Sequence, residues 1–240
     1  MQGCQLVVEN LTLARGPRVL LRQLSFEVRS GEMLLLTGAN GTGKSSLLRA
    51  LIGLTPLQAG RFLWTDPEGS PREVTPLALR SVCLAQGHAA GVKSELTALE
   101  NLRLVAALDT PPMLAASAAD GLEQTPDPVL EQALTRVGLA RQRNIETRRL
   151  SQGQKQRLQL ARFALACLGP HRPLWLMDEP SAALDTQGSA LLQDLLGEHL
   201  VRGGAAIVAT HLALQAPAGQ TRNLRLDDAA RPLAEPAWTP

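Results

Sequence analysis

The sequence has no tyrosine, and aromatic residues make up only 2% of its 240 residues. It also lacks an excess of charge of either sign, since 24 Lys and Arg stand against 22 Asp and Glu. This near balance argues against a nucleic acid as the main partner, because that class of partner requires a basic excess or a basic face. The hydrophobic fraction of 45%, in contrast, suffices for a packed core and excludes a chain disordered throughout.

Cysteines are few: Cys4, Cys83 and Cys167 are odd in number and have no paired spacing that would hold zinc. We therefore expect a reducing compartment. No stretch approaches the roughly 18 consecutive apolar residues of a membrane span. The N-terminus lacks a basic leader followed by an apolar core. We expect a cytoplasmic chain without a membrane segment of its own, which leaves docking onto a membrane protein open.

Predicted strands alternate with predicted helices along the chain. Short apolar runs at 33–37, 174–177 and 205–209 indicate buried strands, and helices are expected at 43–53, 151–168 and 186–201. This alternation favours an α/β fold with a mostly parallel sheet. Further strands are expected at 6–13, 19–28, 61–65 and 81–85, and further helices at 97–108 and 129–137. We predict one domain over 1–228, with a flexible loop at 109–128 and a disordered tail at 229–240.

A phosphate-binding loop follows the first of these buried strands. Residues 38–45 read Gly-Ala-Asn-Gly-Thr-Gly-Lys-Ser and precede a predicted helix. Glycines let backbone amides curl around an anion, and the helix N-terminus adds its dipole. Lys44 supplies a cation for the β- and γ-phosphates, and the Ser45 hydroxyl can bind Mg²⁺. The predicted nucleotide-binding residues here are Gly38, Ala39, Asn40, Gly41, Thr42, Gly43, Lys44, Ser45 and Ser46.

Two carboxylates end the predicted strand 174–177, which makes it a Walker B element. Asp178 and Glu179 emerge at the carboxyl end of that strand, where α/β sheets bind ligands. Asp178 would hold Mg²⁺, and Glu179 would polarise the attacking water. A strand ending in solvated acids is the simpler alternative, but the phosphate loop favours the catalytic interpretation.

Residues 150–154, Leu-Ser-Gln-Gly-Gln, resemble the ABC signature LSGGQ, with Gln152 in place of the first Gly. A Ser-capped helix is the alternative for this segment alone. Residues 182–185 look like a D-loop that ends in Asp185, and His211 looks like a switch histidine. The chain thus resembles the ABC ATPases. The resemblance implies a P-loop NTPase fold with a mostly parallel core, an antiparallel β subdomain and a helical subdomain, the latter at about 87–165.

The resemblance also implies how the site works. ABC ATPases bind ATP and Mg²⁺ between two head-to-tail copies, so the signature residues Ser151, Gln152, Gly153 and Gln154 would act in trans. Lys44, Glu179 and His211 would be catalytic, Asp185 would belong to the D-loop, and Ser45 and Asp178 would bind Mg²⁺. The membrane part would be a separate polypeptide.

Two positions depart from the general family. Without a tyrosine upstream of the phosphate loop, we expect the guanidinium of Arg15 or Arg18 to stack on the adenine. In the Q-loop, His88 stands at the position that matches the family's Gln, and Gln86 lies two residues earlier. We favour His88, with a local shift that brings in Gln86 as the alternative.

Residues 87–102 and 184–204 resemble the CcmA family, the ATP-binding subunits of the heme exporter in bacterial cytochrome c maturation. This resemblance implies a peripheral protein at the cytoplasmic face of the inner membrane. Its membrane subunit would be CcmB-like, with CcmC and the heme chaperone CcmE nearby. ATP would drive heme export or release of heme-loaded chaperone. The ATPase of another small-substrate exporter is the alternative, and intact Glu179 and His211 argue against a module that no longer hydrolyses ATP.

Overall fold

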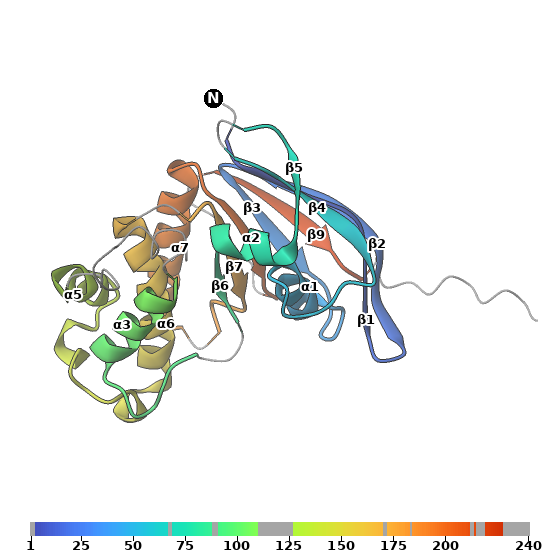
Figure 1. Ribbon diagram of the computed structural model, residues 1–240. Helices are drawn as coiled ribbons and strands as arrows, with labels where there is room; N and C mark the ends of the chain where they lie inside the picture. Colours follow the sequence, from blue (N-terminus) through green and yellow to red (C-terminus); the bar gives the residue numbers. More distant parts are fainter. Residues whose placement is uncertain are drawn as a thin grey trace, which may run out of the picture.

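The computed structural model describes residues 3–66, 69–87, 91–109, 127–169, 172–182, 184–211, 214 and 219–227. Figure 1 shows two sheets packed beside each other and a group of helices at the opposite side of the molecule. The α/β fold class expected from the sequence is confirmed. Within the described ranges, no helix has the length and apolar content that a membrane crossing requires.

The central sheet is parallel and carries the strands that matter for function. Its order is β6-β7-β8-β3-β9, with every neighbouring pair parallel. The strands are β3 (Glu32–Thr37), β6 (Cys83–Gln86), β7 (Leu174–Asp178), β8 (Ala205–Ala209) and β9 (Gln220–Arg225). Strands β7 and β8 are buried along their whole length, as their unbroken apolar runs predict.

The second sheet is antiparallel, in the order β2-β1-β4-β5. It comprises β1 (Gln5–Arg15), β2 (Arg18–Arg29), β4 (Ala59–Thr65) and β5 (Arg72–Val74). A tight turn at Gly16, which has a φ of 59°, joins β1 to β2. Gly60 lies so close to β1 that a Cβ atom there would be 2.6 Å from the Leu11 Cα atom.

Helices cover both faces of the parallel sheet. Helix α1 (Lys44–Leu51) packs with the antiparallel sheet against one face, through alternate residues such as Leu34, Leu36 and Leu176. The intervening residues, Leu35, Trp175 and Met177 among them, join the helical core on the other face. That core holds α3 (Ala98–Asp109), α5 (Asp127–Arg136), α6 (Gln152–Leu168) and α7 (Thr186–Val201), with the 3-10 turns η1 (Ala140–Gln142) and η2 (Thr147–Arg149) nearby.

Three local predictions need correction or limits. The strand expected at 81–85 begins only at Cys83, because α2 (Pro76–Val82) precedes it, capped by Thr75, whose Oγ1 accepts from Ala78 N at 3.2 Å. Strands β5 and β9 were not predicted, since both carry mostly exposed polar residues. The two ends of the expected loop 109–128 belong to α3 and α5, and the rest of it lies outside the described residues. The expected tail 229–240 also lies outside them.

Candidate active site

The candidate site lies at the carboxyl ends of three adjacent parallel strands. Asp178 at the end of β7 pairs with Ala209 of β8, and Ala209 also pairs with Leu36 of β3. The segments that follow these strands therefore emerge side by side. They are the phosphate loop after β3, Glu179 after β7 and His211 just beyond β8. Such an edge is where α/β sheets bind ligands.

Three glycines of the phosphate loop have positive φ angles: 138° at Gly38, 84° at Gly41 and 104° at Gly43. Side chains are disfavoured in this region, so the loop conformation depends on glycine at these positions. A Cβ atom on Gly43 would lie 3.4 Å from the Leu21 side chain, so strand β2 packs directly behind the loop. The buried Lys44 Nζ donates to the carbonyl oxygens of Gly38, at 2.6 Å, and Ala39, at 3.1 Å.

Ser45 and Asp178 lie close enough to share a cation. The Ser45 Oγ donates to Asp178 Oδ1 at 3.0 Å. A hydroxyl and a carboxylate are hard oxygen ligands of the kind that Mg²⁺ prefers. Among the described residues, no group of three or more His, Cys, Asp and Glu could hold a metal alone. The pair therefore fits Mg²⁺ bound together with a nucleotide, which would supply further oxygen ligands.

Glu179 is held in an unusual backbone conformation. Its φ is 51°, in the left-handed region, and its backbone N donates to Ala209 O at 2.8 Å. Strain of this kind gathers at functional sites, where the surrounding structure imposes it. The Glu179 Oε2 atom lies 2.9 Å from His211 Nδ1, and the glutamate side chain is only 14% exposed, against 62% for the histidine. The structure thus brings two of the three predicted catalytic residues, Glu179 and His211, together.

The signature residues lie apart from this cluster, at the start of α6. Ser151 caps the helix: its Oγ accepts from Gln154 N at 3.2 Å, and its own N donates to Gln154 Oε1 at 2.9 Å. Ser151 and Gln152 are exposed and Gly153 is half-buried, so this helix end faces outward. Asp185 caps α7 through Gly188 N, at 2.8 Å.

Other predicted residues lie in the β1–β2 turn, in the phosphate loop and in α1. Arg15 and Arg18 pair across the exposed β1–β2 turn. Ser46 is half-buried in α1, while Asn40 and Gly41 are exposed in the loop. His88 lies outside the described residues. Its alternative, Gln86, is the buried last residue of β6 and lines one groove with Ser45 and Asp178.

One contact of the phosphate loop was missed by the sequence reasoning. Asp227, just after β9, accepts a hydrogen bond from Ala39 N through its Oδ1 atom, at 3.0 Å. No sequence pattern marks this residue, because 188 positions separate it from Ala39 and the contact exists only once β9 pairs with β3.

Comparisons with known proteins show the family of this chain. Residues 21–182 match the family model described as ABC transporter. The chain is 38% identical to the "Cytochrome c biogenesis ATP-binding export protein CcmA" of Vibrio cholerae over 93% of this chain and 99% of that one. It is 41% identical to the protein of the same name from Pseudomonas putida, over 90% and 93% of the two chains. A solved ATP-binding subunit of an ABC transporter superposes with a TM-score of 0.67 at 25% identity, over 86% of this chain and 79% of that one.

Proposed function

Since this chain belongs to the ABC transporter family, and within it to the group of CcmA proteins, we propose that it hydrolyses ATP to drive heme export, or release of heme-loaded chaperone, in cytochrome c biogenesis. The observation that carries the ATPase function is the convergence of Ser45, Asp178, Glu179 and His211 at one sheet edge. The cargo rests on the similarity to CcmA proteins over nearly the whole chain. The family expected from the sequence is thereby confirmed.

Each residue has a proposed task in hydrolysis. The phosphate-loop amides and Lys44 bind the phosphates of ATP, and Lys44 exchanges its contacts with the Gly38 and Ala39 carbonyls for contacts with them. Ser45 and Asp178 would hold Mg²⁺, which would neutralise charge on the phosphates. Glu179 accepts a proton from the attacking water, and His211 exchanges its contact with the Glu179 carboxylate for a hydrogen bond that it donates to the γ-phosphate.

We propose that two copies close head to tail over two ATP molecules. The outward-facing start of α6 supports this arrangement, because a helix N-terminus attracts phosphate and this one is exposed. Ser151, Gly153 and Gln154 of one copy then reach ATP held by the other. Asp185, at the start of α7, also lies within this proposed interface as the D-loop residue.

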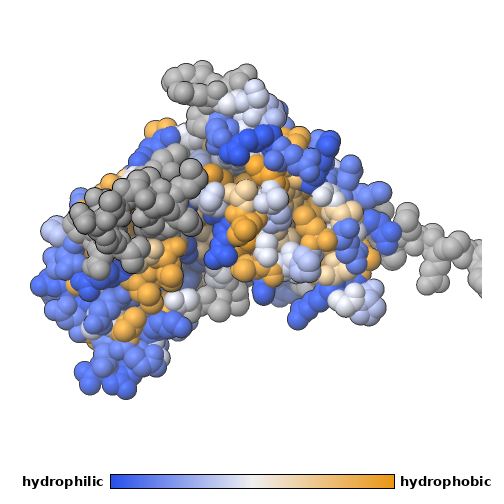
Figure 2. All heavy atoms as spheres, viewed as in Figure 1, coloured by the Kyte–Doolittle hydropathy of each residue, from blue (hydrophilic) through white to orange (hydrophobic). Residues whose placement is uncertain are grey.

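A groove of about 650 Å³ supports docking of a separate membrane subunit. Exposed Leu54, Leu77 and Leu108 lie along it, together with Arg49 and Arg80. Figure 2 shows apolar surface on this face of the molecule, over α2 and over the α3–α6 region. Exposed apolar surface rimmed by charge is typical of a protein interface. Because Ser45 and Asp178 also line this groove, we propose that a CcmB-like subunit occupies only the part beside the exposed leucines, at the cytoplasmic face of the inner membrane, with CcmC and CcmE-like proteins nearby.

The test is co-purification with the Glu179→Gln variant. The variant is expressed in the native host, membranes are solubilised gently with ATP and Mg²⁺, and bound proteins are identified. We expect a multi-span CcmB-like subunit together with heme-handling proteins. Asp194→Asn, an exposed acid on α7, is the matched control and should release the partners normally.

The other outcomes contradict defined parts of the proposal. A different membrane subunit would retain the ABC mechanism and move the cargo to another small substrate. Soluble partners alone would contradict the membrane function. Introducing Leu77→Asp should abolish capture of the membrane subunit while ATP binding persists, and unchanged capture would remove the groove from the proposal.

A further inference from the structure

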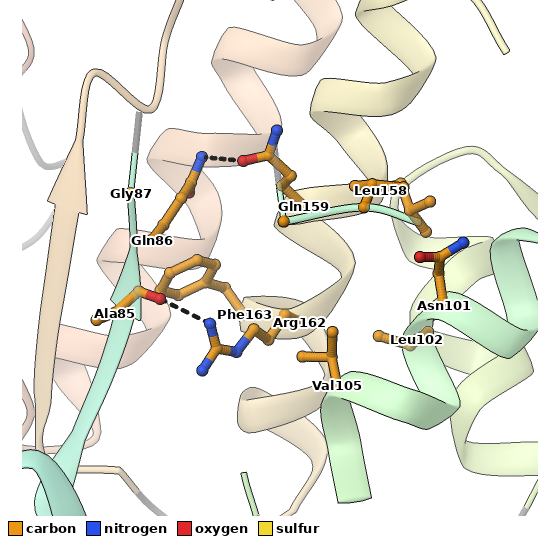
Figure 3. Close-up of a pocket in the computed structure, with 12 residues that line it drawn as sticks. Ala85, Gln86, Gly87, Asn101, Leu102, Val105, Leu158, Gln159, Arg162 and Phe163 are labelled. Atoms are coloured by element: carbon orange, nitrogen blue, oxygen red, sulfur yellow. Dashed lines mark hydrogen bonds between the residues drawn. The ribbon is translucent and has the colours of Figure 1, made fainter. Parts of the chain in front are cut away.

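Three glutamine side chains form a continuous chain of hydrogen bonds. It runs from the groove lined by Gln86 to the backbone next to Glu179. Gln86 Nε2 donates to Gln159 Oε1 at 3.0 Å, and Gln159 Nε2 donates to Gln156 Oε1 at 3.0 Å. Gln156 Nε2 then donates to the carbonyl oxygen of Pro180 at 3.2 Å. Figure 3 shows the first of these contacts, with Gln86 and Gln159 facing each other from β6 and α6.

The two ends of this chain reach different residues of the proposed machinery. Gln86 ends β6 and lines the groove that we propose for the membrane subunit. Pro180 follows Glu179 directly, in a segment that the left-handed Glu179 conformation and its bond to Ala209 already constrain. A shift of the Pro180 carbonyl therefore moves the backbone that carries the Glu179 carboxylate.

The middle of the chain is built into α6. Gln156 and Gln159 are three residues apart, so they share one face of the helix. Gln86 and Gln156 are each only 8% exposed, and buried amides are costly unless hydrogen-bonded. Their hydrogen bonds are therefore strongly favoured. A cavity of about 230 Å³ beside Gln86 and Gln159 leaves room for the Gln86 segment to move.

The direction of the bonds is uniform. Each amide nitrogen donates toward Pro180, and each internal amide oxygen accepts from the previous residue. Bonds aligned this way polarise one another, so rotating one amide weakens the others. At the open end, Gln86 Oε1 is buried without a hydrogen-bond partner. A change at Gln86 therefore alters the strength of all the hydrogen bonds in this row of glutamines.

We propose that Gln159 is a positioning residue for ATP hydrolysis, which with Gln156 ties Gln86 in the docking groove to Pro180 and so to Glu179. Docking at the groove and the geometry of the catalytic carboxylate are linked through these amides. The inference rests on the proposed roles of Glu179 and of the groove, but it is independent of the cargo.

The test compares Gln159→Met, Gln156→Met and the double variant by steady-state hydrolysis, equilibrium ATP binding and thermal unfolding. Methionine keeps the length of glutamine but removes its amide. We expect Gln159→Met to lower kcat about fivefold, the factor that corresponds to one neutral hydrogen bond, with KM and ATP affinity unchanged. The double variant should lose no more than the worse single one, because both break the same chain. Gln193→Met on α7 is the matched control and should behave as wild type.

A second variant separates the two bonds of Gln159. Gln159→Glu still accepts from Gln86 Nε2 but cannot donate to Gln156. We expect it to be as slow as Gln159→Met, and wild-type kcat in it would overturn the chain. So would additive losses in the double variant, or a fall in kcat matched by an equal fall in ATP affinity, which would mean a packing role. A lower Tm is expected in either case, because the substitution leaves the buried Gln86 and Gln156 amides without this partner.

The same measurements are made with and without the membrane subunit. In the chain variants, stimulation of hydrolysis by that subunit should fall along with kcat, and unchanged stimulation would contradict the link to the groove. Failure of the proposed function is recognised separately, because Glu179→Gln would then hydrolyse ATP normally in this assay.

Discussion

At the phosphate-loop edge, predicted functional side chains contact one another: Ser45 bonds Asp178, and Glu179 lies against His211. At the start of α6, Ser151 and Gln154 instead bond each other as a local helix cap and face outward. The first region is assembled from distant segments by the sheet, whereas the second needs only four consecutive residues. The difference shows that one half of the proposed site is assembled within a chain, whereas the other half is a local helix cap at the surface, as the proposed head-to-tail dimer would require.

The largest expected effect comes from the assembled edge. Glu179→Gln removes the proton acceptor but keeps the size of the side chain, so hydrolysis should fall by at least about 100-fold. ATP binding should survive, and the variant should accumulate as an ATP-bound dimer on size-exclusion chromatography. Asp194→Asn serves as control, and normal turnover of Glu179→Gln would refute the assigned role.

The signature end can be broken without unfolding its helix. Ser151→Asp retains a good helix cap but places a negative charge where the partner's phosphates would bind. We expect hydrolysis to fall by about tenfold or more while Tm stays near the wild-type value. Ser151→Ala should instead act mainly on stability, which falls by about 1 kcal/mol because the helix cap is lost.

Mixing two damaged chains sharpens the comparison. Lys44→Ala is defective at the phosphate loop and Ser151→Asp at the signature. If the two halves meet across copies, a mixture contains dimers with one intact composite site. The mixture should then hydrolyse ATP faster than either variant does alone, and a mixture no more active than its components would place both halves within one chain.

A smaller effect is expected at the exposed β1–β2 turn. If a guanidinium stacks on adenine, Arg15→Ala or Arg18→Ala should weaken ATP binding several-fold, about the strength of a cation–π contact. Isothermal titration measures this directly. Arg22→Ala, exposed on β2, is the control, and unchanged affinity in both test variants would end the stacking hypothesis.

The smallest expected effect comes from the core and touches neither region. Burial raises the pKa of the Cys4 and Cys167 thiols from 9.0 to about 11, and raises that of Cys83 as well. Unfolded thiols ionise first, so the stability that neutral thiols contribute is present below pH 9 and is lost as the pH rises toward 11. Tm should therefore fall over this range. Cys4→Ala should reduce the slope, and an identical slope would assign the loss to other groups.

The elements that could be predicted from the sequence are those whose own residues indicate burial or a helix cap. The apolar runs of β3, β7 and β8 and the capped helix α6 are local signals, and they sufficed for the fold class and for the residues at the strand ends. The composition of β9 does not indicate a strand, because Gln220–Arg225 is polar and mostly exposed. Only pairing with β3 makes it a strand. For the same reason the role of Asp227 could not be predicted from the sequence. The role of Gln159 could not be predicted either, because one of its partners lies in strand β6 and the other in its own helix.

The position of β3 has a consequence for how the molecule is made. Its two neighbours in the sheet, β8 and β9, come from residues 205–225, and the loop after it is fastened by Asp227. During synthesis on the ribosome, residues 38–45 emerge early but have no sheet to fold into. The nucleotide pocket therefore closes last, and a chain released before residue 227 carries the complete phosphate-loop sequence without the framework that shapes it.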